Sequence, residues 1–154
     1  MKIISGGQTG VDRAALDAAR ESRVAAGGWC PEGRLSEDGT IPDEYPVIEL
    51  ASAGYNERSR QNVIDSDGTA VIYFSNPTGG TKQTIDFCIQ EQKPYALIDA
   101  KVLTVEQAIN KIQEFIDLYT ISILNVAGPR ASEEPVAYAY ARKTIKGVLH
   151  THIA

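Results

Sequence analysis

Four stretches of the chain are nearly continuous runs of β-branched and other large apolar residues, at 2–5, 69–74, 95–98 and 121–126. A strand with one face in water alternates apolar and polar residues, whereas a strand buried on both faces does not. These four stretches therefore predict parallel strands in the middle of a layered fold. Weaker strand patterns lie at 24–27 and 47–49.

Helical periodicity fills the segments between these strands. Apolar residues from Val11 to Ala19 recur with the spacing of a helix that buries one stripe, so a helix is expected directly after Gly10. Thr104, with Gln107 three residues later, has the spacing of a capping box and predicts a second helix start. Further helices are expected after Thr81, after Ser132 and, with a polar composition, over 56–66.

The alternation of strands and helices along the whole chain predicts right-handed crossovers between parallel strands. We therefore expect residues 1–154 to form a single α/β domain, a three-layer sandwich around a mostly parallel sheet of about five or six strands. The stretch 29–46 lacks strong periodicity and holds several glycines and prolines, and we interpret it as an ordered functional loop.

The composition is that of a globular protein, with 43% apolar residues, 23% charged residues and a formal net charge of -5 at pH 7. This apolar content is too high for a disordered chain, and the acidic balance disfavours a broad basic surface for nucleic acid. No apolar run approaches the roughly 20 residues of a membrane helix or forms a secretory signal. We expect a cytoplasmic protein with neither a nucleic-acid nor a membrane partner.

Nucleophiles and metal ligands are sparse in the sequence. Cys30 and Cys88 lie far apart, and His150 and His152 both fall in the last five residues, so we predict reduced thiols and no metal site. The acidic candidates Asp12, Glu37, Asp38, Asp67 and Asp99 show no spacing that defines an acid and a base. No catalytic residue can be assigned from these patterns, which favour a binding protein over an enzyme.

Three glycine-bearing turns each follow a predicted strand and precede a predicted helix. Their residues are Gly6, Gly7, Gln8, Thr9 and Gly10, then Gly79, Gly80 and Thr81, then Gly128, Pro129 and Arg130. The carboxyl ends of parallel strands share one edge of the sheet, where open α/β sheets bind their ligands. Because glycine permits close approach and helix N-termini offer free N–H groups, we predict that these residues bind a phosphorylated small molecule.

Cations near these turns could complete such a site. Arg13 lies in the first turn of its helix, where it binds an anion or pairs with Asp17. Arg130 follows a rigid proline and either contacts phosphate or pairs with the glutamates after it, and Lys82 is a further cation or a solvated residue. One face of the polar helix, facing either solvent or a ligand, carries Arg58, Asn62 and Asp65.

Six segments carry more specific information than any single turn. They are SGGQTGVDRAALD at 5–17, GGWCPEGR at 27–34, EDG at 37–39, NVIDSD at 62–67, GGT at 79–81 and LNVAGPR at 124–130. Together they resemble the molybdenum cofactor carrier protein family, over nearly the whole chain. The resemblance implies a Rossmann-like subunit, related to lysine-decarboxylase-like nucleotide-binding proteins, that holds the molybdenum cofactor. This cofactor, molybdopterin, is a pterin with a phosphate and a dithiolene-bound molybdenum, and the glycine turns, Arg13 and Arg130 would supply its donors.

The wider superfamily includes phosphoribohydrolases, whose motif PGGxGTxxE ends in a catalytic glutamate. Here Pro77 precedes a differently spaced Gly79-Gly80-Thr81, and Thr84 stands where the glutamate is expected. This departure favours a carrier over a hydrolase and leaves a nucleotide-binding enzyme or sensor, holding a nucleotide phosphate, as the alternative.

The last predicted helix is apolar over more than one stripe, because Tyr138 and Tyr140 add to its small apolar residues. Together with the resemblance, this pattern predicts a homo-oligomer, either a dimer or a tetramer. The alternative is a helix wedged between the sheet and a neighbouring helix within one chain.

Overall fold

The computed structural model describes residues 1–153, with side chains through Thr151, and its central layer is a sheet of five parallel strands. These strands are β1 (Lys2–Ile4), β2 (Ala25–Gly27), β7 (Gly68–Tyr73), β8 (Tyr95–Asp99) and β9 (Ile123–Ala127). They lie in the order β2-β1-β9-β7-β8, and every neighbouring pair is parallel. The predicted α/β class and parallel sheet are confirmed.

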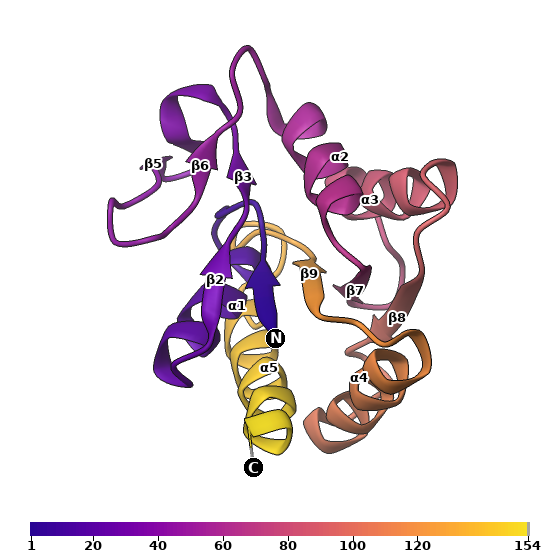
Figure 1. The fold of residues 1–154 in the computed structure, drawn as a ribbon. Helices are drawn as coiled ribbons and strands as arrows, with labels where there is room; N and C mark the ends of the chain where they lie inside the picture. The colour runs from indigo at the N-terminus through magenta and orange to yellow at the C-terminus, as the bar shows by residue number, and fades with distance from the viewer. Residues whose placement is uncertain (154) are drawn as a thin grey trace.

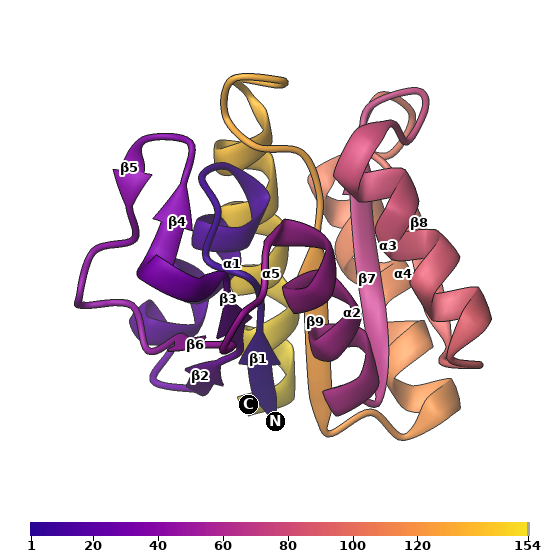
Figure 2. The same ribbon diagram turned by 90° about the horizontal axis from the view of Figure 1, so that it is seen from above.

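Helices cover both faces of this sheet and complete the three layers (Figure 1). They are α1 (Val11–Glu21), α2 (Tyr55–Asp65), α3 (Gly79–Gln90), α4 (Val105–Tyr119) and α5 (Ala137–Ile153). On one face α5 packs between α1 and α4, and on the other α2 packs against α3, as the view from above also shows (Figure 2). The core lies between the layers, with Ile72, Ile98 and Leu124 fully buried, as expected for strands covered on both faces.

The strand order contains a switch point between β9 and β7. If the unit of β9 and α5 preceded β1, the five strands would follow the order 3-2-1-4-5 of a doubly wound sheet. From β9 the chain continues to α5 on one face, and from β7 it continues to α3 on the other. The two connections therefore part at the carboxyl ends of β9 and β7, which opens a crevice between them.

The predicted strand at 47–49 does not join the central sheet. Instead β6 (Ile48–Glu49) pairs with β3 (Trp29–Cys30), and between them lie the short helix η1 (Glu32–Arg34) and a hairpin of β4 (Leu35–Ser36) and β5 (Gly39–Thr40). We call residues 29–49 the arm. Arg34 orders it by donating hydrogen bonds to the carbonyl oxygens of Ile41, Pro42, Tyr45 and Val47, since a guanidinium has five donors.

Two predicted helix starts are shifted. The last helix begins at Ala137 rather than at Ser132, because Glu134 precedes Pro135 and the residue before a proline is disfavoured in helical geometry. The helix that was expected after Thr81 is α3, and it begins earlier, at Gly79. Thr78 is its N-cap, so both Gly79 and Gly80 lie in its first turn.

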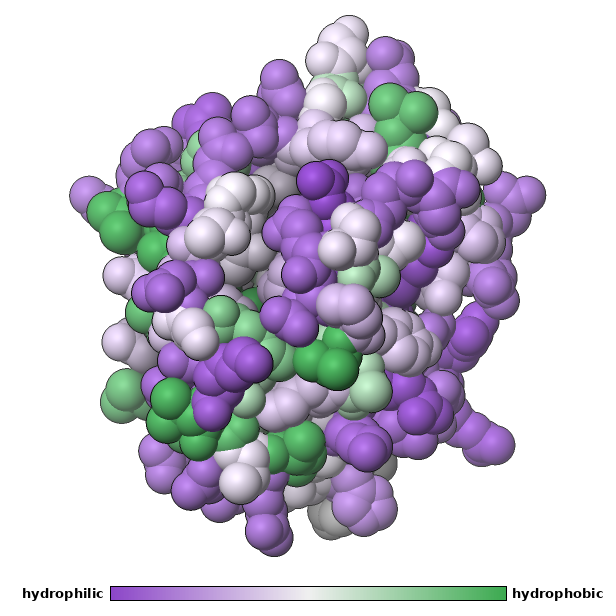
Figure 3. Space-filling model, turned by 180° about the vertical axis from the view of Figure 1, so that it is seen from behind, coloured by the Kyte–Doolittle hydropathy of each residue, from purple (hydrophilic) through white to green (hydrophobic). Residues whose placement is uncertain are grey.

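The two tyrosines of α5 are used within the chain. The hydroxyl of Tyr138 donates to the carboxylate of Asp17 on α1, and that of Tyr140 donates to the carbonyl of Leu103, 2.9 Å away. Elsewhere, large apolar side chains such as Leu118 are exposed, and from behind the apolar areas lie among hydrophilic ones (Figure 3). The homo-oligomer therefore stays a prediction. None of the described helices combines the length and hydropathy that a membrane span requires.

The first and third glycine-bearing turns are interlocked. The N–H of Val11 donates to the carbonyl of Pro129 (3.2 Å), and the N–H of Ala131 donates to Oγ1 of Thr9 (3.1 Å). Between them Gly10 has φ 79° and ψ -126°, a conformation open mainly to glycine, and a Cβ there would lie 2.5 Å from the Pro129 oxygen.

Substitution of Gly10 by alanine should therefore separate the two turns. We expect Gly10→Ala to lower the free energy of unfolding by about 3 kcal/mol, through backbone strain and the collision with Pro129. Gly33→Ala is the control, because Gly33 also has a positive φ of 80° but faces only the side chain of Leu35 at 3.7 Å; its expected loss is about 1 kcal/mol. Urea denaturation measures both, and equal losses would contradict the interlock.

Candidate functional site

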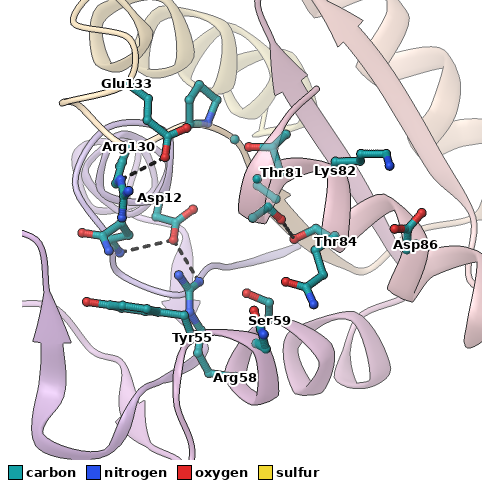
Figure 4. Close-up of a pocket in the computed structure, with 18 residues that line it drawn as sticks. Asp12, Tyr55, Arg58, Ser59, Thr81, Lys82, Thr84, Asp86, Arg130 and Glu133 are labelled. Atoms are coloured by element: carbon teal, nitrogen blue, oxygen red, sulfur yellow. Dashed lines mark hydrogen bonds and ion pairs between the residues drawn. The ribbon is translucent and has the colours of Figure 1, made fainter. Parts of the chain in front are cut away.

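A cavity of about 590 Å³ lies at the carboxyl ends of the strands, in the crevice between β9 and β7 (Figure 4). Its walls come from the turn after β1, the N-terminal half of α2, the first turns of α3 and the turn after β9. Its volume falls in the range of small-molecule sites, and its position is the one at which open α/β sheets bind ligands.

The cavity brings together part of each of the three glycine-bearing turns. Seven of the residues named from the sequence line it, namely Gln8, Gly79, Gly80, Thr81, Gly128, Pro129 and Arg130. Five others, namely Gly6, Gly7, Thr9, Gly10 and Arg13, support these turns without being among the residues that line the cavity. Sequence reasoning thus located the turns, and the structure separates the residues that line the cavity from those that support them.

The N-terminus of α3 forms one wall of the cavity. Gly79 and Gly80 begin this helix, and at both positions the space that a Cβ would occupy is open within 4 Å. The first N–H groups of a helix have no partner inside it and carry a partial positive charge. Behind them the hydroxyl of Thr84 donates to the carbonyl of Gly80 (3.0 Å). This wall therefore presents backbone donors suited to an anion.

A buried ion pair forms the base of the cavity. Nη1 of Arg58 lies 3.1 Å from Oδ2 of Asp12, and the N–H of Gln8 donates to the same oxygen (3.2 Å). Asp12 is only 5% exposed, and burial raises the pKa of its carboxyl although Arg58 acts in the opposite direction. Nε of Arg58 is buried without a hydrogen-bond partner among the described residues. The guanidinium thus retains donors that a ligand could use.

Gly6 makes room for this guanidinium. A Cβ at Gly6 would lie 1.5 Å from Nη1 of Arg58, so a larger residue would displace the arginine from the cavity. The same helical face carries Asn62 and Asp65, and both of these hold Trp29. Asn62 Oδ1 accepts from the Trp29 N–H (2.8 Å), and Asp65 Oδ2 accepts from its indole N–H (2.6 Å). This face therefore turns inward at Arg58 and Asn62, with Arg58 at the cavity and Asp65 at its exposed end.

The two arginines named from the sequence have different surroundings. Arg13 is only 12% exposed and donates to Asp38 (2.6 and 2.8 Å), to Ser36 (3.0 Å) and to the carbonyl of Gly7 (3.0 Å). It joins α1 to the arm. Arg130 is 44% exposed, lines the cavity and lies 2.9 Å from a carboxylate oxygen of Glu133. The glutamate pairing weighed for Arg130 is present, and the arginine still faces the cavity.

The remaining candidates from the sequence make contacts that hold the fold together or are buried away from the cavity. Asp67 and Asp99 each accept two backbone N–H groups, and Glu37 accepts from Ser132. Both cysteines are buried, and burial raises the pKa of their thiols, which disfavours the reactive thiolate. His150 is exposed, and the side chain of His152 lies outside the described residues. In that part of the chain no three His, Cys, Asp or Glu side chains are grouped as a metal site would need.

The cavity is lined by equal numbers of positive and negative side chains, but not all of them are already paired with one another. Arg58, Lys82 and Arg130 face Asp12, Asp86 and Glu133. Both arginines are paired with carboxylates, whereas no ion pair within the described residues includes Lys82. An anion near α3 would therefore meet one unpaired cation and the helix N-terminus.

The sequence of residues 3–149 matches the model of the circularly permutated YpsA SLOG family. The chain belongs to this family. Permutation agrees with the strand order, since moving β9 and α5 to the front restores the 3-2-1-4-5 sheet. The same fold is found in the crystal structure of a protein named "Putative molybdenum carrier protein" from Syntrophus aciditrophicus SB. That protein is 41% identical, with a TM-score of 0.94, and the match covers 96% of this chain and 94% of that one. No functionally curated protein matches the chain.

Sequence reasoning left one wall of this cavity undecided, because the face of the polar helix that carries Arg58 could meet either solvent or a ligand. The first half of α2 contributes Tyr55, Asn56, Arg58 and Ser59. Motifs that follow strands identify turns at the edge of the central sheet. The helix α2 instead follows the arm, so no such motif marks its place at the cavity. The available signal was the unusual polarity of this helix, which left the direction of its arginine open.

We expect the two arginines to differ in their effect on stability. Arg13→Ala removes four hydrogen bonds and a contact with the Tyr45 ring, and should lower the free energy of unfolding by about 2 to 3 kcal/mol. Arg130→Ala removes an exposed ion pair and should cost less than about 1 kcal/mol. Urea denaturation at pH 7 tests this contrast, and a larger loss for Arg130→Ala would refute it.

The pair of Arg13 and Asp38 also predicts an acid sensitivity. Hydrogen bonds from Arg13 and Ser36 hold the pKa of the Asp38 carboxyl well below its usual range. The unfolded chain therefore binds more protons here, and this contribution to stability is lost as pH falls below about 4. Denaturation curves from pH 7 to pH 2 should show a smaller loss for Asp38→Asn, which starts less stable at pH 7. Parallel profiles for variant and wild type would argue against this assignment.

Proposed function

We propose that the chain is a binding or carrier protein that holds a phosphorylated small molecule in this cavity, with the pterin phosphate of the molybdenum cofactor as its cargo. One observation carries the proposal: the N-terminus of α3 and three cations from different elements, Arg58, Lys82 and Arg130, meet in one cavity at the switch point of the sheet. The name of the similar protein from Syntrophus supports the molybdenum part.

The phosphate of the cargo fits the α3 wall. There the N–H groups of Gly79 and Gly80 lie beside Lys82, and no side chain fills the space above the two glycines. Gln8, Gly128 and Pro129 close the cavity from the opposite turns, and Arg130 reaches its rim. Gly6, Gly7, Thr9, Gly10 and Arg13 contribute by holding these turns in place.

Molybdenum in this cavity would be held through the oxygens and the pterin bound to it, and not by protein side chains that ligate the metal. The residues lining it include neither cysteine nor histidine in the described part of the chain, so the side chains preferred for soft metals are missing. The lining offers hydrogen-bond donors, which suit the phosphate and the oxygens on the metal. The protein would thus hold the cargo through its anionic groups.

A second candidate is a nucleotide-binding enzyme or sensor. The observation in its favour is Asp12, a buried carboxylate at the base of the cavity that is paired with Arg58; burial raises its pKa, which suits a general base. Incubation with nucleoside monophosphates separates the enzyme from the carrier, because a carrier releases neither base nor phosphate. A sensor would also release neither, but nucleotide binding would change its oligomeric state or its binding to a partner.

Binding measurements with Arg130→Ala test the carrier proposal. We expect this variant to weaken binding of a pterin monophosphate about 10-fold, through loss of a charged hydrogen bond, while its thermal midpoint stays close to that of the wild type. The matched control is Arg142→Ala, which removes another exposed arginine paired with a glutamate, Glu21 at 2.7 Å, outside the cavity. Calorimetry measures the affinities, and native mass spectrometry with molybdenum analysis identifies any bound molecule. Equal affinity of all three proteins would contradict the role of Arg130.

A further inference from the structure

The two ends of the cavity differ in chemistry. At one end lie the N-terminus of α3 and Lys82, which suit an anion, and at the other lies Tyr55 on the first turn of α2. Figure 4 shows Tyr55 and Lys82 on opposite sides of the cavity, with Asp12 and Arg58 on the side of Tyr55. A ligand that spans the cavity must therefore be unlike at its two ends.

Tyr55 is the one aromatic residue among the described residues that line the cavity. Its ring is held on one side by Arg58, whose guanidinium carbon lies 5.9 Å from the ring centroid. The tyrosine is nevertheless 41% exposed. One face of an amphipathic ring is thus supported by a cation, and the residue combines a large exposed surface with a place in the lining of the cavity.

The side chains near Tyr55 can recognise the edge of a planar ring. Oε1 of Gln8 accepts the N–H groups of Thr9 (3.1 Å) and Glu37 (2.9 Å), which fixes the amide and leaves its NH2 group for the cavity. Asn56, the next residue after Tyr55, is exposed and also lines the cavity. Amide groups offer donors and acceptors together, as the edges of pterins and purines do.

We infer that Tyr55 is the stacking platform for a planar heteroaromatic ring, and that the cavity selects ligands in which such a ring is joined to a phosphate. The ring lies against the open side of Tyr55, and the phosphate lies at the N-terminus of α3. This inference rests on the proposed function for its phosphate end and adds the specificity-determining residue at the other end. Inorganic phosphate and sugar phosphates occupy only half of the site.

Three ligands separate the two ends of the cavity by calorimetry: neopterin monophosphate, AMP and ribose 5-phosphate. Tyr55→Ala should weaken binding of both ring-bearing ligands about 10-fold or more, because an aromatic platform contributes this much to the binding of a base. Binding of ribose 5-phosphate should be unchanged. Tyr55→Phe keeps the ring and should restore both affinities, together with the change in pterin fluorescence that stacking produces.

Tyr119 provides a matched control for Tyr55. Tyr119→Ala removes a tyrosine of similar exposure, 52%, on α4 outside the cavity, and should affect none of the ligands. Equal weakening of all three ligands by Tyr55→Ala, or no weakening, overturns the stacking role. If AMP binds and the pterin does not, the proposed cargo is wrong and Tyr55 is judged on AMP alone. If none of the three ligands binds the wild-type protein, both proposals fail.

Discussion

The burial of both faces of a parallel sheet is the constraint on which the site depends. Because the strands are all parallel, every connection must cross from one edge of the sheet to the other, and the turns after β1, β7 and β9 meet at the same edge. Helices on both faces then force the connections after β9 and β7 apart. The cavity is therefore a product of topology, and the residues of the turns determine only its chemistry.

The buried pair of Asp12 and Arg58 adds little to stability as a simple attraction. Removing two charges from water costs about as much as their contact returns. Here the pair fixes the guanidinium above Gly6 and leaves Nε without a partner. A charge so placed changes its surroundings little when an anion arrives, because its orientation is already established.

Much of this fold follows from patterns visible in the sequence. Continuous apolar runs predicted the buried strands β7, β8 and β9, and the Thr104 capping box predicted the start of α4. Glycine turns after strands led to three walls of the cavity. The fourth wall, with Tyr55 and Arg58, could not be predicted in this way, because the arm that positions α2 is ordered by Arg34 and backbone carbonyls. Such contacts depend on tertiary geometry and leave no periodic pattern.

The permuted strand order also governs when the site can form. The strand β9 lies between β1 and β7 and pairs with both, although it is the last strand of the sheet in chain order. Until it inserts, the pair of β1 and β2 and the pair of β7 and β8 share no hydrogen-bonded edge. Closing the sheet requires contacts between residues more than 120 positions apart, such as Lys2 with Ile123, and long-range pairing of this kind is slow. During synthesis the cavity can therefore form only after β9 and the turn that follows it, through Arg130, have been made.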